Sequence, residues 1–179
     1  MSRPKVNDDN NFKASKFRLM LYPEDLTHCK ALEYIEKHYD CCYILHDKDI
    51  ITQTDIDNHP DKGYILGELK KPHWHIVLRV SGSRWVSSLA SEFGITCNYF
   101  MKCDSYEKAL QYLTHYNNEY KYQYSIDEVK GSLKSRLIKV IENDGKTEDE
   151  RILDLILYID GYNGYLSVTN FAYYCQSQG

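Results

Sequence analysis

The clearest pattern of hydrophobic and polar positions lies at residues 71–80, where the two kinds of side chain alternate with a period of two. This period predicts a β-strand, because successive side chains of a strand point to opposite faces of a sheet. The apolar face, which is expected to lie on a core, consists of Trp74, Ile76, Leu78 and Val80. The opposite face carries His73, His75, Val77 and Arg79. Residues two apart on a strand are separated by roughly 6.6 Å, so both imidazoles can bind one small ion.

Other segments alternate with the period of a strand or repeat with the period of a helix. Together with residues 71–80, strands are expected at residues 17–22, 41–45, 96–101 and 121–125. Helices are expected at residues 23–39, 83–93 and 104–116. Helices that return the chain across one face of an antiparallel sheet give an α+β fold. The order of elements therefore predicts a ferredoxin-like, five-stranded antiparallel sheet with flanking helices, and its free face is the one to which His73 and His75 point.

Residue types at the ends of two expected helices agree with this assignment. Ser83 is a suitable N-cap for the second helix, and Gly94 is expected to end it. Asp104-x-x-Glu107 resembles a capping box at the start of the third helix, with aspartate in place of serine or threonine.

The chain is expected to consist of a tail and two folded parts. Residues 1–15 are polar and have the composition of a mobile N-terminal tail. Residues 16–131 hold the expected sheet, including a long polar loop at residues 49–70 with a small hairpin near residues 64–66. Loops of this length in compact domains are often functional. Residues 132–179 are expected to form a small helical segment.

Only helical patterns remain after Ser132. Three apolar stripes have helical spacing: Leu133, Leu137, Val140 and Ile141; Ile152, Leu155, Ile156 and Ile159; Val168, Phe171, Ala172 and Cys175. A Thr147-x-x-Glu150 capping box precedes the second stripe. Short amphipathic helices bury little surface alone, so we expect this segment to pack on the first domain or to form a homo-oligomer. The third stripe continues almost to Gly179, a pattern typical of a fragment of a longer protein.

Composition narrows the class of protein without naming a function. The chain is 42% hydrophobic and 27% charged, which is ordinary for a soluble globular protein. It has no apolar run of the roughly 20 residues that span a membrane and begins without a signal peptide, so a cytoplasmic protein without a membrane partner is expected. The six cysteines are scattered and favour neither a disulfide framework nor a zinc ribbon. The net charge of −4 gives no general argument for binding nucleic acid, so any such argument must come from a site.

Four residues have the chemistry of a metal site. His46 and Asp49 follow the second expected strand, which we expect to lie beside the strand that carries His73 and His75. Three imidazoles and a carboxylate suit Mn²⁺, Co²⁺ or Zn²⁺, whereas Mg²⁺ prefers more oxygen ligands. The alternative is that His-x-His occurs by chance on a solvated strand. A zinc protease is excluded because the chain has no His-Glu-x-x-His on a helix.

Tyr112 is a candidate nucleophile on the third expected helix. The buried stripe of that helix consists of Tyr106, Ala109, Leu110 and Leu113. Tyr112 and Tyr116 lie together on one flank, four residues apart. The alternative is that Tyr112 is a boundary aromatic residue with its hydroxyl in water. Since the chain has 17 tyrosines, periodicity alone does not select this one.

Three motifs in this order resemble a known family: His46-Asp47-Lys48-Asp49, Lys71-Pro72-His73-Trp74-His75 and Tyr112-Leu113-Thr114-His115. They are similar to those of the HUH-endonuclease initiators of rolling-circle plasmid replication, and most of all to the Rep proteins of small streptococcal and staphylococcal plasmids. The first strand, with its sequence FRLMLYPE at residues 17–24, is also similar. The resemblance covers about residues 16–125. The acidic loop at residues 50–69 departs from it, because it is longer than in compact members.

The resemblance implies a fold, a reaction and a metal. It implies a five-stranded antiparallel sheet, metal ligands at His46, Asp49, His73 and His75, and Tyr112 as nucleophile. The metal would be a divalent ion, with Mn²⁺ in first place and Mg²⁺, Co²⁺ or Zn²⁺ as alternatives. The reaction would nick one strand of bacterial plasmid origin DNA, single-stranded or in a hairpin at the nick. It would leave a 5′-phosphotyrosine and a free 3′-OH for replication.

Other roles are assigned as hypotheses. Contacts to DNA phosphates are expected from Lys48, Lys70, Lys71, Arg79, Arg84 and Lys102, each of which is alternatively a solvated surface cation. Candidates for the terminating step are Tyr116, Glu107 and Glu119. A conjugative relaxase or a single-tyrosine transposase would share the chemistry, and a non-catalytic DNA-binding or copy-control protein is the alternative from a different class.

Overall fold

The computed structural model describes residues 10–146 and the single residues 150, 152 and 159, and every structural statement below concerns these residues. The chain divides into two compact units, residues 1–137 and 138–179, and the first holds the sheet and the site. The described strands and long helices are β1 (Lys13–Leu21), α1 (Leu26–His38), β2 (Asp40–His46), α2 (Gln53–Asn58), β3 (His73–Trp85), α3 (Val86–Phe93), β4 (Phe100–Lys102), α4 (Tyr106–Thr114) and α5 (Lys134–Glu142).

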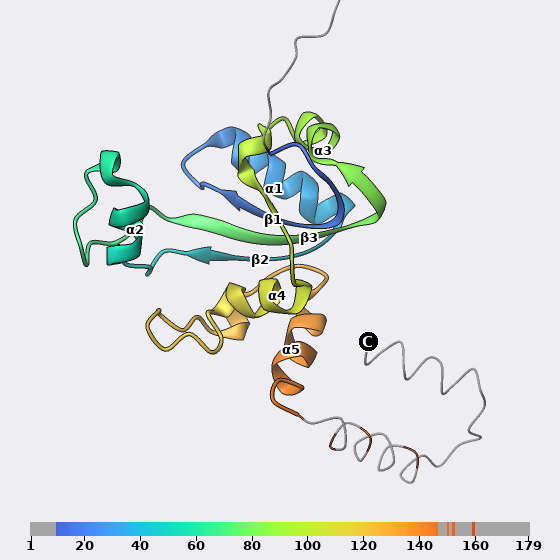
Figure 1. The fold of residues 1–179 in the computed structure, drawn as a ribbon. Helices are drawn as coiled ribbons and strands as arrows, with labels where there is room; N and C mark the ends of the chain where they lie inside the picture. Colours follow the sequence, from blue (N-terminus) through green and yellow to red (C-terminus); the bar gives the residue numbers. More distant parts are fainter. Residues whose placement is uncertain (1–9, 147–149, 151, 153–158, 160–179) are drawn as a thin grey trace, which may run out of the picture. The chain divides into compact units, whose positions relative to one another are not determined.

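The strands form one antiparallel sheet in the order β2-β3-β1-β4 (Figure 1). The long strand β3 lies between β1 and β2. In the β2–β3 pair, His46 is opposite His73, and Ile44 is opposite His75. The end of β2 therefore lies beside the start of β3, as the sequence predicts, and all three histidines are at the same end of the sheet.

The expected fifth strand at residues 121–125 is not formed, and the described sheet has four strands. The tyrosines of this segment favour a strand locally, but the segment is irregular. The outer edge of β2 is instead paired by one bridge, in which the backbones of Tyr43 and Lys130 exchange two hydrogen bonds of 2.9 Å. Leu133 donates a further backbone hydrogen bond of 3.0 Å to the carbonyl of Cys41. Backbone groups at this edge are thus satisfied by residues that follow the expected strand.

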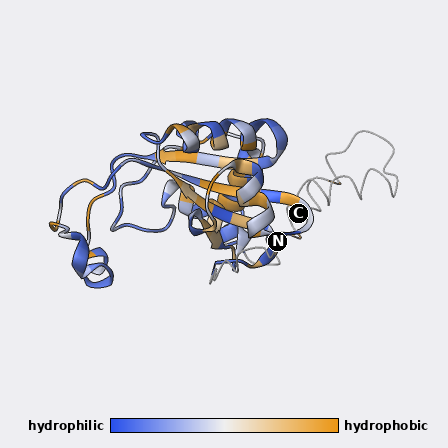
Figure 2. Ribbon diagram, turned by 90° about the horizontal axis from the view of Figure 1, so that it is seen from above, coloured by the Kyte–Doolittle hydropathy of each residue, from blue (hydrophilic) through white to orange (hydrophobic). Residues whose placement is uncertain are grey.

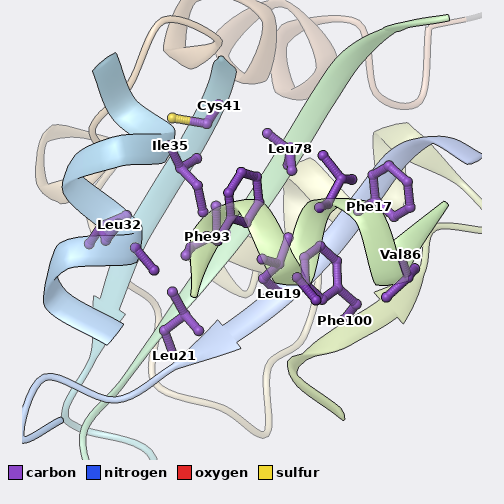
Figure 3. Close-up of a cluster of buried hydrophobic side chains, with 14 of the residues drawn as sticks. Phe17, Leu19, Leu21, Leu32, Ile35, Cys41, Leu78, Val86, Phe93 and Phe100 are labelled. Carbon is purple, nitrogen blue, oxygen red and sulfur yellow. The ribbon is translucent and has the colours of Figure 1, made fainter. Parts of the chain in front are cut away.

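One face of the sheet is covered by α1 and α3 (Figure 1). The core on this face combines alternate residues of β1 and β3 with the apolar sides of the two helices (Figure 3). The expected apolar face of β3 is confirmed, since Ile76, Leu78 and Val80 are buried in this core and Trp74 packs against it. The strands carry the most hydrophobic positions, and the chain between β2 and β3 is mainly hydrophilic (Figure 2).

The expectation that the second face is free is wrong. α4 packs against β2 and β3 on this side (Figure 1). Cys42, Ile44 and Val77 point away from the first core, and all three are buried. Leu110 and Leu113 of α4 are also fully buried. The apolar side chains on both faces of β2 explain the second layer, because a strand with two apolar faces needs cover on both.

Long-range strand pairing shifts two boundaries. β3 continues to Trp85, which is opposite Lys13 in β1, so Ser83 lies inside the strand and does not cap α3. Gly94 ends α3 with a positive φ of 70°, as predicted. The pairing of Lys13 also means that the end of the expected tail, residues 10–15, leads into the sheet; residues 1–9 lie outside the described residues.

The region between α3 and α4 is less regular than the pattern predicts. Strand β4 has three residues, and a 3-10 turn at Cys97–Tyr99 takes the place of the first part of the expected strand. Ser105 caps α4, because its hydroxyl accepts a hydrogen bond of 3.3 Å from the backbone N–H of Lys108. The predicted capping box at Asp104 is therefore wrong by one residue.

The long polar segment at residues 49–70 contains a helix that the sequence analysis missed. Thr52 and Asp55 form a reciprocal capping box at the start of α2. The expected hairpin at residues 64–66 is absent from this described segment, which instead turns between Gly63 and Gly67. Its two ends are joined by a bridge between Ile50 and Leu69. The segment therefore begins and ends beside the histidines.

The helical pattern after Ser132 is seen as α5, in which Leu137 is fully buried. The expected Thr147-x-x-Glu150 box and the stripes at residues 152–159 and 168–175 lie outside the described residues, apart from single positions. Among the helices that are described, none has the length and apolar character needed to cross a bilayer.

Replacement of Gly131 by alanine should destabilise the outer edge of β2, against which Gly131 packs. Gly131 has a φ of 102°, and an added Cβ would overlap the backbone carbonyl of Cys41. Since backbone must move to relieve the overlap, we expect Gly131→Ala to lower the free energy of unfolding by about 3 kcal/mol. Gly94→Ala is the matched control: φ is also positive, but a Cβ would meet nothing within 4 Å, so a loss of about 1 kcal/mol is expected. Equal losses in urea denaturation would contradict the close approach.

Candidate active site

Three histidines from two neighbouring strands converge at one end of the sheet. The cross-strand pair His46 and His73 is joined by His75, two residues along β3. One ring nitrogen from each of the three lies within 4.8 Å of the others. Nε2 of His73 is 3.1 Å from Nε2 of His75. All three side chains are buried.

The hydrogen bonds of two rings show which nitrogens carry lone pairs. His73 donates Nδ1–H to the carbonyl of Lys71 at 2.7 Å, so its Nε2 carries the lone pair that faces His75. His46 donates Nε2–H to the carbonyl of Leu113 at 2.8 Å, so the lone pair is on Nδ1. That Nδ1 is buried and has no hydrogen-bond partner. A backbone carbonyl that fixes the tautomer of a histidine is typical of metal ligands, and the residues fit a divalent cation.

Asp49 contacts a partly different set of residues. One carboxylate oxygen is 3.4 Å from Nδ1 of His46. The other is 3.7 Å from Nδ1 of His115 and accepts a hydrogen bond of 3.3 Å from the Tyr124 hydroxyl. The four predicted ligands, together with His115, therefore form two groups that share His46: His46, His73 and His75, and His46, Asp49 and His115.

Burial controls the charge of the site. It lowers the pKa of His75 well below the usual value and also lowers the pKa of His73. Burial lowers the pKa of His115 to about 4. For Asp49, burial opposes ionisation, but the neighbouring His46, His115 and Lys121 outweigh it and hold the pKa below its ordinary value. At neutral pH the rings of His73, His75 and His115 are neutral, the form that binds metals, and the carboxylate is charged.

Tyr112 lies beside this cluster, on the side of α4 that flanks the buried stripe. Its ring centroid is 5.1 Å from those of His75 and His115 and 6.2 Å from that of His46. The side chain is half-buried. Its hydroxyl accepts a hydrogen bond of 2.9 Å from Nζ of Lys121. The structure thus brings Tyr112 together with the three histidines of the two strands.

The end of α4 explains how these residues meet. His115 has a left-handed conformation with φ of 56°, and Tyr116 N–H donates to the carbonyl of Gln111 at 3.1 Å. This is a Schellman motif, a position where glycine is usual. The end of the helix leaves the carbonyl of Leu113 free to accept the hydrogen bond from His46. Because Tyr116 lies beyond the helix, the expected pair of Tyr112 and Tyr116 on one helical flank is wrong.

Three residues of the site were missed by the sequence analysis: His115, Lys121 and Tyr124. The Tyr124 ring stacks on His46 at a centroid distance of 4.4 Å and an angle of 4°, and its oxygen accepts a hydrogen bond of 2.8 Å from the backbone of Lys48. Burial raises the pKa of Tyr124. A histidine where a helix end favours glycine was a signal for His115. Lys121 and Tyr124 had none, because the pattern around them predicts a strand.

The predicted DNA contacts lie in two places. Lys48 follows β2, and Lys70 and Lys71 precede β3, so these three flank the histidines. The others lie towards the far end of the strands; Arg79, for example, is six residues from His73, roughly 20 Å along β3. All six are paired with a carboxylate: Lys48 with Glu128, Lys70 with Asp55, Lys71 with Glu24, Arg79 with Asp40, Arg84 with Glu92 and Lys102 with Asp104.

The three candidates for a terminating step lie at both ends of α4 and in the loop after it. Glu107 is exposed in the first turn of α4, more than one turn before Tyr112. Glu119 is exposed in the loop after the helix, and Tyr116 is half-buried at its start. His115 lies beside the tyrosine instead, with its ring centroid 5.1 Å from that of Tyr112.

The fold and the site define an α+β domain with a histidine cluster on its sheet. Residues 9–134 match the plasmid replication protein, origin binding domain family, and the chain belongs to that family. It is similar to a replication protein of Onion yellows phytoplasma (strain OY-M), with 35% identity over 120 residues, 65% of this chain and 31% of that protein. It is also similar to the replication protein RepB of Lactiplantibacillus plantarum, with 26% identity over 163 residues, 89% of this chain and 67% of that protein. The chain thus spans less than a third of the phytoplasma relative.

The stability of the metal-free protein should depend on His115 below neutral pH. The folded protein holds the pKa of His115 at about 4, whereas an unfolded histidine titrates near 6.5. The unfolded state therefore binds more protons between these values, so stability is full above pH 6.5 and is lost as pH falls towards 4. The loss from this residue is at most roughly 3 kcal/mol.

His115→Asn tests this dependence, because asparagine tolerates a left-handed conformation but does not titrate. In urea denaturation with a chelator, the variant should lose less stability than the wild type between pH 7 and pH 4.5. His59→Asn, at an exposed position, should keep the wild-type dependence. An unchanged dependence in His115→Asn would refute the assignment.

Proposed function

We propose that this chain is a plasmid replication initiator that nicks one strand of origin DNA with Tyr112 as the nucleophile. The observation that carries the proposal is the position of Tyr112, with its ring 5.1 Å from that of His75 and next to the His46, His73 and His75 cluster. Membership in a family of plasmid origin binding domains supports the substrate. It also favours an initiator over a relaxase or a transposase.

The metal would be held by His46, His73 and His75, with Asp49 completing the set. Three imidazole nitrogens and one carboxylate favour Mn²⁺, with Co²⁺, Zn²⁺ or Mg²⁺ as alternatives. When bound, such an ion supplies positive charge that orients the scissile phosphate and stabilises the charge on it. The neutral His73 and His75 and the ionised Asp49 are already in the protonation states that ligands need.

The reaction of the chain itself is a phosphoryl transfer to Tyr112. The tyrosine oxygen forms a bond to phosphorus, and the bond from phosphorus to the 3′ oxygen breaks, which leaves a 5′-phosphotyrosine and a 3′-OH. The 3′-OH primes rolling-circle synthesis. Because the phosphotyrosine conserves the energy of the phosphodiester, a later strand joining needs no ATP.

The substrate at the nick would be single-stranded or extruded from a hairpin. Tyr112 is half-buried and its hydroxyl lies against Lys121 of the loop that follows α4, so a phosphate must leave the regular duplex to reach it. Lys48, Lys70 and Lys71 flank the histidines and are the contacts best placed for the DNA backbone. Self-association through residues 132–179 remains a prediction.

A covalent adduct is the direct test of the reaction. A labelled single-stranded oligonucleotide that carries the origin of the encoding plasmid is incubated with protein and Mn²⁺, and the products are separated on a denaturing gel. The wild type should form a protein–DNA adduct, and Tyr112→Phe should form none. Tyr106→Phe should react like the wild type, since it removes a hydroxyl from the same helix that has no hydrogen-bond partner. DNA binding without an adduct would favour the copy-control alternative.

Metal binding is tested separately from activity. At a hundredfold excess over its dissociation constant, Mn²⁺ should add about 2.7 kcal/mol to the free energy of unfolding. His75→Ala should lose most of this increment, whatever its stability without metal, because one ligand is gone. His59→Ala replaces an exposed histidine and should keep it. An increment that survives in His75→Ala would place the metal elsewhere.

A further inference from the structure

We propose that Lys121 is a catalytic residue that stabilises the attacking oxygen of Tyr112; this inference rests on the proposed nicking reaction. Nζ of Lys121 donates a hydrogen bond of 2.9 Å to the Tyr112 hydroxyl oxygen. The same ammonium group is 4.8 Å from the centroid of the tyrosine ring. Lys121 thus contacts the atom that would form the new bond to phosphorus.

The backbone around Lys121 holds it at this position. The loop that leaves α4 is closed by His115, whose Nδ1–H donates to the carbonyl of Tyr122 at 2.8 Å. A second closure runs from Tyr124 N–H to the carbonyl of Thr114, at 3.2 Å. Both closures connect the end of the helix that carries Tyr112 to the residues next to Lys121.

Contacts inside the loop fix the lysine further. Lys121 N–H donates to the carbonyl of Asn118 at 3.0 Å. The side-chain amide of Gln123 donates to the carbonyls of Asn118 and Lys121, at 2.7 and 3.0 Å. A half-buried lysine on a loop with these hydrogen bonds keeps its position without a rearrangement during the reaction.

The side-chain partner of Lys121 differs from the partners of the other basic residues near the site. Lys48, Lys70 and Lys71 are each paired with a carboxylate. Within the part of the chain that the structure describes, no salt bridge involves Lys121, and its polar side-chain partner is the Tyr112 hydroxyl. Lys121 also lowers the pKa of the nearby Asp49, but the hydrogen bond of its ammonium group goes to the Tyr112 oxygen, so a phenolate at this atom would accept a charge-assisted hydrogen bond.

This contact stabilises the charged form of the nucleophile in both directions of the reaction. In the nicking step, the Tyr112 hydroxyl gives its proton to water, and the phenolate oxygen forms the bond to phosphorus. The electron pair of the broken bond leaves with the 3′ oxygen, which takes a proton from water. In strand joining the 3′-OH gives its proton to water and attacks phosphorus, and the phenolate leaves beside the ammonium group of Lys121 and then takes a proton from water. Lysine is neither consumed nor deprotonated.

The test separates a contact to the nucleophile from a contact to a DNA phosphate. Single-turnover adduct formation with Mn²⁺ is measured on the single-stranded origin oligonucleotide, and the dissociation constant of the DNA is measured separately. Lys121→Met should lower the rate at saturating DNA roughly 100-fold, with a change in the dissociation constant below about threefold. Lys121→Arg keeps a cationic donor and should recover most of the rate.

Lys16→Met is the matched control, because Lys16 also lies over a tyrosine ring, 4.5 Å from the centroid of Tyr106, outside the site. It removes the same charge and should react like the wild type. A wild-type rate in Lys121→Met, no recovery in Lys121→Arg, or a loss found only in the dissociation constant would overturn the role of Lys121 while the nicking reaction stands. A wild type that forms no adduct would overturn both.

Discussion

The antiparallel pairing of β2 with β3 is the interaction on which the site depends. It places His46 opposite His73, and the alternation of β3 then places His75 on the same side. A shift of the register by one residue would turn these side chains to the opposite face. The register is held because Cys41, Tyr43, Ile76 and Leu78 all belong to the core on the other face of the sheet. Hydrophobic burial on one face therefore positions the polar cluster on the other.

A second layer, formed by α4, buries the histidine cluster and so sets its protonation state. α4 covers the face that carries the histidines, and its last carbonyls accept hydrogen bonds from a strand histidine and from the returning loop. The cover removes water from the imidazoles, and burial keeps those of His73, His75 and His115 neutral because it penalises the charged form. A histidine cluster on an open face would instead remain solvated and titrate near neutral pH. The same helix that buries the ligands also carries Tyr112, so ligand protection and nucleophile placement have a common structural origin.

The region from residue 115 to residue 124 joins these two layers. His115 ends α4 in a conformation that costs roughly 1 kcal/mol for a residue other than glycine. The strained end turns the chain back towards the sheet, and the loop then brings Lys121 to Tyr112 and Tyr124 to His46. The cost is offset by hydrogen bonds from the His115 ring and to the carbonyls at the helix end. The left-handed conformation of His115 is therefore needed to bring Lys121 and Tyr124 into the site.

Local patterns in the sequence were sufficient to identify β1, β2, β3, α1, α3 and α4 and to assign the residues on the two faces of β3. Period-two alternation identified β3, its buried face and the direction of His73 and His75, since side-chain direction along a strand is a local property. Tertiary contacts decided the rest. Pairing with β1 extended β3 past Ser83, apolar residues on both faces of β2 brought α4 onto the second face, and an irregular loop replaced the expected strand at residues 121–125. His115, Lys121 and Tyr124 joined the site through this irregular loop. His115 and Lys121 are placed by hydrogen bonds within it, to Tyr122 and Tyr112, and Tyr124 bonds the distant segment after β2; no local period records either kind of contact.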